Sequence, residues 1–179
     1  MKSRLVLALC LTVASACAGV IQDVRQAIAK DDFALGEKYI NDYRAQNGVT
    51  AEMLEALSWL GRGSLAAKRY DKADAYAAQT RKLSLEMLKK RPLDADNYLP
   101  IALGASIEVQ GHVLAARGER SGAVEFLQRE VETYRNTSIR TRIQKNINLL
   151  SLEGKPAPAL AMKEWLGSRP TALDRKSVV

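Results

Sequence analysis

The sequence predicts an all-α protein made of antiparallel helical hairpins that stack side by side. Apolar residues recur at intervals of three and four from Val20 to Leu152, and no useful run of alternating polar and apolar residues precedes Gly154. Alanine is abundant and aromatic residues make up only 6% of the chain, which favours closely packed helices. We therefore expect a right-handed helical solenoid followed by a mostly irregular C-terminal tail.

Residues 1–18 have the features of an export signal. Lys2 and Arg4 precede the apolar run Leu5 to Val13, and small residues follow it. The run is too short to span about 30 Å of hydrocarbon. Cleavage after Ala16 or Ala18 would release a soluble periplasmic protein. Alternatively, Cys17 is lipidated and the protein is membrane-anchored, because residues 13–17 resemble a bacterial lipoprotein signal, although Ala14 stands where leucine is usual.

The composition argues against several kinds of chemistry. The two cysteines both lie in the leader, so the remaining chain offers no disulfide and no reactive thiol. His112 is the only histidine, and Asp31-Asp32 is better placed to cap a helix than to complete a metal site. We therefore expect no catalytic, cofactor-binding or metal-ligating residue in this chain, and no cofactor.

The net charge of +7 comes partly from the leader and the tail, and residues 17–173 carry +4, with most of that excess between Arg135 and Lys145. Arg135, Arg140, Arg142 and Lys145 form a stretch without acidic residues. Such a stretch is either a nucleic-acid-binding surface or a solvated helix face, and export favours the second.

Helix boundaries in the first half of the body follow from capping residues. Val20 to Lys30 and Asp32 to Gln46 form a first pair, which Asn47-Gly48 ends. Thr50 is a suitable N-cap for a helix that extends to Leu65.

Later helices show the same kind of boundary. Tyr70 or Asp71 begins a helix that Arg91-Pro92 closes. Asp94 to Asn97 caps the next, which ends at Gly118 and carries Pro100 in its first turn. The last two helices are predicted to start after caps at Ser121 and at Thr137 or Ser138.

Two hairpins share a spacing of small residues. Gly61 to Ala73 and Gly111 to Ala123 are each twelve positions apart. Small side chains on facing helices allow the backbones to approach closely, and Tyr70 is placed to fill the corner between them. The expected packing positions are Gly61, Tyr70, Ala73, Gly111, Gly118 and Ala123.

This spacing resembles the tetratricopeptide repeat, most clearly over Leu60 to Tyr76 (LGRGSLAAKRYDKADAY), with Phe33 and Gly36 marking a weaker earlier copy. The copies lie 37 and 50 residues apart instead of the usual 34, and Arg120 replaces the turn aromatic. Residues 19–152 are therefore expected to be either a divergent repeat domain or generic helical hairpins.

Residues 153–173 differ in character. The run Gly154 to Pro158 and the residues that follow it resemble the start of redoxin and TlpA-like thioredoxin domains, whose catalytic cysteines would lie beyond Val179. Asp174 to Val179 (DRKSVV) is also the translation of a common sequencing adapter, so these six residues are expected to be an artefact. The resemblance implies a thiol–disulfide oxidoreductase whose catalytic domain is missing from this chain.

Two functions remain open at this point. The first is a non-catalytic helical-repeat module of such an exported enzyme, which holds a protein or peptide partner in a groove. The alternative is a free-standing periplasmic adaptor or lipoprotein in envelope assembly. Neither function requires nucleic acid, and a membrane is involved only if Cys17 carries a lipid.

Trp59 is either a stacking platform for a ligand or a packing residue.

Overall fold

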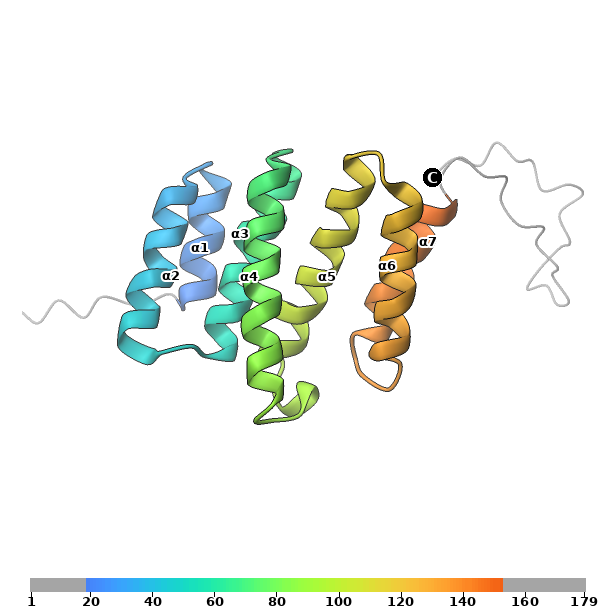
Figure 1. Ribbon diagram of the computed structural model, residues 1–179. Coiled ribbons are helices and arrows are strands. Elements are labelled where there is room, and N and C mark those ends of the chain that lie inside the picture. The colour runs from blue at the N-terminus through green and yellow to red at the C-terminus, as the bar shows by residue number, and fades with distance from the viewer. Residues whose placement is uncertain (1–18, 153–179) are drawn as a thin grey trace, which may run out of the picture.

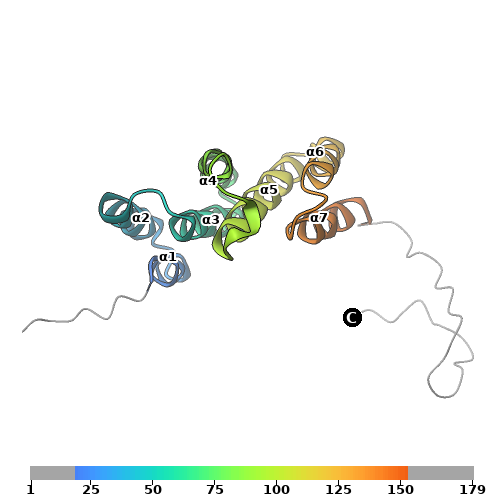
Figure 2. The ribbon, with the colours of Figure 1, turned by 90° about the horizontal axis from the view of Figure 1, so that it is seen from below.

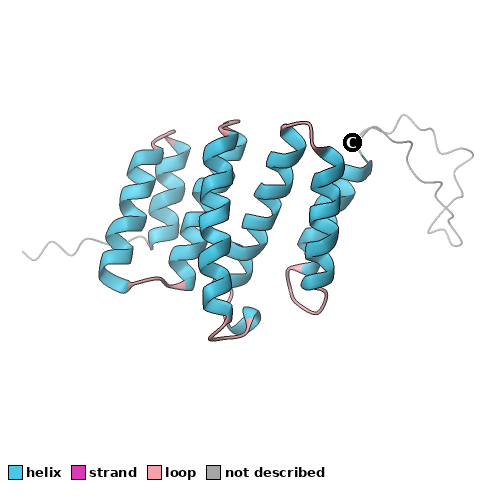
Figure 3. Cartoon of the chain, viewed as in Figure 1, coloured by secondary structure: helices cyan, strands magenta, loops and turns pink. Residues whose placement is uncertain are grey.

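The computed structural model describes residues 19–152, and within them the fold is all-α, as the sequence predicts. The described part contains no strand (Figure 3). Its helices are α1 (Val20–Ala29), α2 (Phe33–Asn47), α3 (Ala51–Ala66), α4 (Tyr70–Leu88), α5 (Tyr98–Ala116), α6 (Arg120–Thr133) and α7 (Arg140–Leu152), with a short 3₁₀ helix η1 (Leu93–Ala95) before α5. The leader with Cys17, and residues 153–179, lie outside the described residues.

The helices stand side by side and alternate in direction, so that consecutive helices form antiparallel hairpins (Figure 1). Seen along the helix axes, α1, α3, α5 and α7 form one curved layer, and α4 and α6 lie on its convex side (Figure 2). Contacts run along the curved layer from α1 to α3, from α3 to α5 and from α5 to α7. The concave side of this layer is called the inner face below.

The core lies between the layers and is continuous from α1 to α7. Leu54, Leu60, Leu103, Leu127 and Ile143 are all fully buried in it. Helix α5 is apolar and long enough to cross a membrane, but it packs against α3, α4, α6 and α7 as the central helix of this core. Its apolar surface is therefore explained by helix packing.

Three turns between helices have the same hydrogen bonds. In the α1–α2 turn Asp31 has a positive φ of 57°, in the α3–α4 turn Lys68 has 56°, and in the α5–α6 turn Gly118 has 90°. At each turn the next residue donates its N–H to the carbonyl five positions back, as Arg69 does to Ser64 at 2.8 Å. This is the Schellman helix end, in which a left-handed residue reverses the chain. The described domain therefore contains a local structural repeat.

Several helix boundaries follow the sequence prediction. Asp32 accepts a hydrogen bond from the Leu35 N–H and Thr50 accepts one from the Met53 N–H, which caps α2 and α3. Asp96 accepts hydrogen bonds from the N–H groups of Tyr98 and Leu99 at the start of α5.

Three boundaries differ from the prediction. Helix α4 ends at Leu88, well before Pro92, and a turn and η1 complete the connection. Helix α6 begins at Arg120, without a cap from Ser121, because the Schellman turn restarts the helix two residues after Gly118. Helix α7 begins at Arg140, because the Ser138 hydroxyl and N–H bind Asp94 across the connection instead of capping a helix.

Candidate functional site

Of the predicted packing positions, Gly61 and Ala73 lie on the contact between α3 and α4. A Cβ on Gly61 would lie 3.6 Å from the Ala77 nitrogen and 3.7 Å from the Ala73 carbonyl oxygen, so the backbones of α3 and α4 are close here. Tyr70 packs on a small cluster that joins α4 to α5. Gly118 supplies the positive φ of its turn.

The second small pair is arranged differently. A Cβ on Gly111 would lie 3.1 Å from three carbons of the Leu127 side chain, so the residue opposite this glycine is a leucine of α6. Ala123 is fully buried one helical turn before Leu127. The structure thus brings Gly61 and Ala73 together, while Gly111 is faced by Leu127, which sequence reasoning did not single out.

The inner face carries polar and aromatic side chains that take no part in the contact between α3 and α4. Helix α3 turns Gly61 toward α4, so residues on its other side point away from the core between the layers. Glu55, Trp59 and Arg62 are four and three positions apart, which places them on one stripe of α3.

At the α1–α3 end of the inner face, two arginines stack on Trp59. The guanidinium carbon of Arg25, from α1, lies 4.5 Å from the centre of the indole ring, and that of Arg62 lies 4.0 Å from it. Both distances are within the range of cation–π attraction. Arg25 is exposed and Arg62 is half-buried.

Glu55 lies beside this pair with 9% of its surface exposed. Burial raises the pKa of its carboxyl group, and the nearby Trp59 N–H, Arg62 and Arg25 partly oppose that shift. The Trp59 Nε1 is buried but does not reach hydrogen-bonding geometry with any acceptor in residues 19–152. The Trp59 N–H therefore attracts the Glu55 carboxylate through space, without a formed hydrogen bond.

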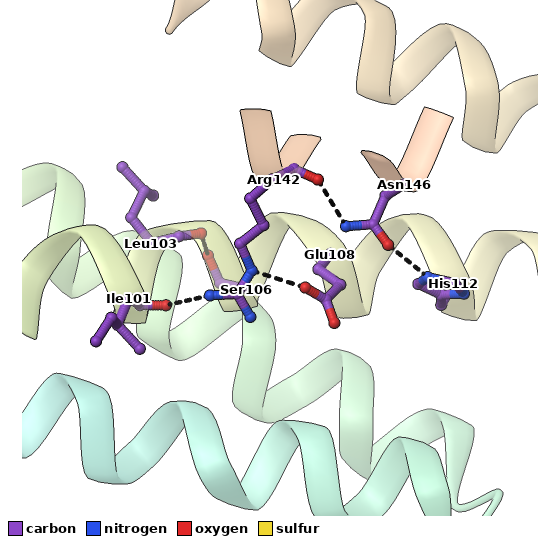
Figure 4. A network of polar contacts seen from close by, with 7 residues as sticks. All are labelled: Ile101, Leu103, Ser106, Glu108, His112, Arg142 and Asn146. Carbon is purple, nitrogen blue, oxygen red and sulfur yellow. Dashed lines mark hydrogen bonds and ion pairs between the residues drawn. The ribbon is translucent and has the colours of Figure 1, made fainter. Parts of the chain in front are cut away.

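The α5–α7 end of the inner face is a closed polar network (Figure 4). Arg142 donates from Nε to Glu108 at 2.7 Å and from Nη1 to the Ile101 carbonyl at 3.4 Å. Asn146 Nδ2 donates to the Arg142 carbonyl, and Asn146 Oδ1 lies 2.8 Å from His112 Nε2. His112 therefore carries its proton on Nε2 in this arrangement and acts as a donor.

A glycine makes this network possible. A Cβ on Gly104 would lie 3.1 Å from Arg142 Cδ and 3.4 Å from Ile139 Cγ2. The absence of a side chain at Gly104 lets α7 approach α5 closely enough for Arg142 to lie across it. The basic stretch predicted as a solvated face is thus divided, because Arg135, Arg140 and Lys145 are exposed whereas Arg142 is half-buried in an ion pair.

The two aspartates that were considered as possible metal ligands form contacts within the fold. Asp31 forms an ion pair with Arg69 of the next hairpin at 2.8 Å, and Asp32 caps α2. No group of three or more metal-ligating side chains occurs among the residues that the structure describes.

The arginines on Trp59 were missed by sequence reasoning, although a signal for them was present. Arg25, Arg62 and His112 each lie six residues before the left-handed residue of their own hairpin turn. The offsets of 37 and 50 residues that align the small residues also align these three positions. Comparison of the chain with protein-family models, curated proteins and solved structures finds no match.

Proposed function

We propose that residues 19–152 are a protein-binding module and that a partner polypeptide lies across the inner face. The observation that carries this proposal is the continuity of that face. Stacking connects side chains of α1 and α3, an ion pair and hydrogen bonds connect side chains of α5 and α7, and Arg62 of α3 interacts electrostatically with Glu108 of α5. A surface built from successive repeats of one layer is suited to an extended partner.

The chemistry of the inner face suits polypeptide recognition. It presents an indole ring and two guanidinium groups next to one another. Two half-buried isoleucines share these helix faces by their spacing, Ile21 one turn before Arg25 and Ile101 two turns before Glu108. Tryptophan and arginine are the residue types that most often carry the binding energy of protein interfaces.

We further propose that this module belongs to an exported thiol–disulfide oxidoreductase and presents partners to its catalytic domain. The support is the Gly154 to Pro158 run, which lies outside the described residues, together with an apolar edge at the end of the described fold. Leu149 and Leu152 of α7 are 52% and 50% exposed, and they line a hollow of about 920 Å³. A following domain would cover this edge.

The binding role is tested by site-specific photo-crosslinking in the cells that make the protein. A photoreactive phenylalanine analogue replaces Ile21 or Ile101 on the inner face, and Lys82 or Gln128 on exposed positions of α4 and α6 as matched controls. We expect the same partner protein to be joined to both inner positions and to neither control. Equal crosslinking from all four positions, or none, contradicts the proposal.

The larger assignment has a separate test. Extending the coding sequence past Leu173 should reveal a Trp-Cys-x-x-Cys motif, and a natural stop soon after that codon contradicts it. The mass of the mature N-terminus distinguishes cleavage after Ala16 or Ala18 from lipidation of Cys17.

A further inference from the structure

Two arginines that form no ion pair within residues 19–152 occupy equivalent places in consecutive hairpins. Arg25 lies six residues before Asp31, and Arg62 lies six residues before Lys68, where each of these later residues is the left-handed residue of its turn. Because the turns have the same hydrogen bonds, the two side chains start from corresponding points of adjacent helices in the curved layer. The repeat therefore places both guanidinium groups against the same ring, that of Trp59.

Neither guanidinium group has an acidic partner within residues 19–152. Each has only the contact with the Trp59 ring, so its N–H donors are not used by a carboxylate of the domain. Of the neighbouring acids, Glu108 is paired with Arg142 at 2.7 Å, and Glu55 is buried and attracts both arginines without forming an ion pair with either. This contrasts with Arg69, Arg81 and Arg117, each of which reaches an acidic side chain.

The electrostatic environment of Arg62 agrees with this geometry. Burial lowers the pKa of Arg62, and the positive charge of Arg142 lowers it further. Glu108 and Glu55 oppose that effect, and Arg25 adds to the repulsion. Arg25 of α1 and Arg142 of α7 thus both repel Arg62 of α3, and an incoming anion would relieve that repulsion.

We propose that Arg25, Trp59 and Arg62 form a binding site for a carboxylate of an acidic segment in the partner protein. This inference rests on the proposed protein-binding role and names the chemistry by which the partner is recognised. Guanidinium groups bind carboxylates through two parallel N–H donors, and stacking on an indole ring holds a guanidinium in place for that contact.

The surroundings favour a short acidic peptide over a polyanion. Glu55 and Glu108 lie among the arginines of the inner face and would repel a phosphate backbone running along it. Ile21 and Ile28 flank Arg25 at spacings of four and three residues, and both are half-buried against the core. A polypeptide can present a carboxylate beside an apolar side chain, and this part of the inner face has arginines for the first and isoleucines for the second.

The experiment uses Trp59 as its own reporter. Trp165→Phe leaves Trp59 as the single tryptophan, because the chain has two. The purified protein is titrated with the peptide acetyl-Ser-Gly-Glu-Glu-Gly-Ser-amide, and binding is followed by tryptophan fluorescence and calorimetry. The matched probes are the same peptide with two glutamines, the glutamine peptide with a free C-terminal carboxylate, and inorganic phosphate at equal ionic strength.

We expect saturable binding of the glutamate peptide with a dissociation constant at or below about 1 mM, and weaker binding at higher salt. The double substitution Arg25→Gln and Arg62→Gln should weaken it at least tenfold. Arg129→Gln on α6, which removes the same charge from an exposed position, should change it less than twofold. Thermal unfolding of each variant shows whether the fold is retained, and Trp59→Leu provides a second way to remove the site.

Three results overturn the carboxylate site. These are equal binding of the glutamine amide peptide, an unchanged affinity in the double variant, and a phosphate response as strong as that of the peptide. Binding of the free-acid glutamine peptide alone assigns the site to a chain terminus instead of an acidic side chain.

Failure here is distinguishable from failure of the protein-binding role. If the inner-face crosslinks persist in the double variant, the protein-binding role stands and the carboxylate site is wrong. If crosslinks are absent from the wild-type protein while the peptide binds normally, the site is present and the protein-binding role is wrong.

Discussion

The hairpins α3–α4 and α5–α6 have the same spacing of small residues but are closed by different contacts. In the first, the missing side chain of Gly61 faces the backbone of α4 with room for a methyl group. In the second, the space beside Gly111 is occupied by the side chain of Leu127, which is fully buried and would lie 3.1 Å from an added methyl group. Equal spacing therefore predicts the location of a helix contact without predicting how tightly it is packed.

The two hairpins are joined by an ion pair between their second helices. Arg81 of α4 contacts Glu130 of α6 at 2.6 Å, and their side chains are 23% and 9% exposed. Arg81 also donates to Gln110 of α5 and lies over the Phe126 ring. Burial raises the pKa of the adjacent Tyr134, and the negative charge of Glu130 adds to that shift. This polar link is the counterpart, on the convex side, of the unpaired arginines on the inner face.

The largest expected effect comes from breaking that link. Arg81→Ala leaves the Glu130 carboxylate buried without its partner and should lower the free energy of unfolding by about 3 kcal/mol. Urea denaturation measures this change. Arg129→Ala on the same outer layer is the control and should cost less than about 0.5 kcal/mol. Combining Arg81→Met with Glu130→Leu should recover most of the loss; if it does not, the role assigned to the buried charge is wrong.

The comparison of the two glycines gives the next prediction. Gly111→Ala pushes a methyl group into Leu127 and should destabilise the protein by about 1 to 3 kcal/mol. Gly61→Ala meets atoms at ordinary contact distance and should be neutral or stabilising by up to about 1 kcal/mol, because alanine favours the helix. Denaturation of the two variants side by side decides the matter. Equal losses would show that both glycines are needed for close approach.

Substitutions at the left-handed residues of two turns should change the stability by smaller amounts, upward at Lys68 and downward at Gly118. Lys68→Gly should stabilise the protein by up to about 1 kcal/mol, because an exposed lysine is held in the left-handed conformation that glycine adopts freely. Gly118→Ala should cost about 1 kcal/mol for the same reason. Thermal unfolding of the two variants and the wild type measures both changes. Destabilisation by Lys68→Gly would mean that the lysine side chain contributes a contact at this turn.

The smallest effect concerns the pH dependence at Glu55. Because burial raises the pKa of this carboxyl group in the folded state, its protonated form is favoured by folding. That stabilisation is fully present below the usual glutamate pKa and is lost as the pH rises through the folded value. Glu55→Gln should therefore flatten the fall in stability over that interval and raise the melting temperature at neutral pH. A variant with the same pH profile as the wild type would contradict this assignment.

Much of the fold could be predicted from residues that act locally. Asn47-Gly48, Thr50 and Pro100 mark helix ends and starts through backbone geometry and capping, which need no distant partner. Ser121 and Ser138 are good capping residues by type, but neither caps a helix in the structure, and α6 already begins at Arg120 after the turn at Gly118. Ser138 binds Asp94, which comes from a different connection of the chain.

The inner-face site was harder to predict because its members come from different helices. Trp59 could be read only as a stacking or packing residue, since the arginine of α1 that covers it lies 34 positions earlier. The repeat offset of 37 residues aligns Arg25 with Arg62 in the sequence. This alignment does not tell whether either arginine forms an ion pair with a carboxylate. Whether an arginine is neutralised depends on which carboxylates the packing brings within 4 Å.

The sequence by itself determined the helical class, the number and order of the hairpins and the places where helices come close, because helix periodicity and capping act over a few residues. Only the tertiary structure decided which charges are paired and which glycine is tightly packed. These properties depend on distances between side chains far apart in the chain, and small shifts between packed helices change them.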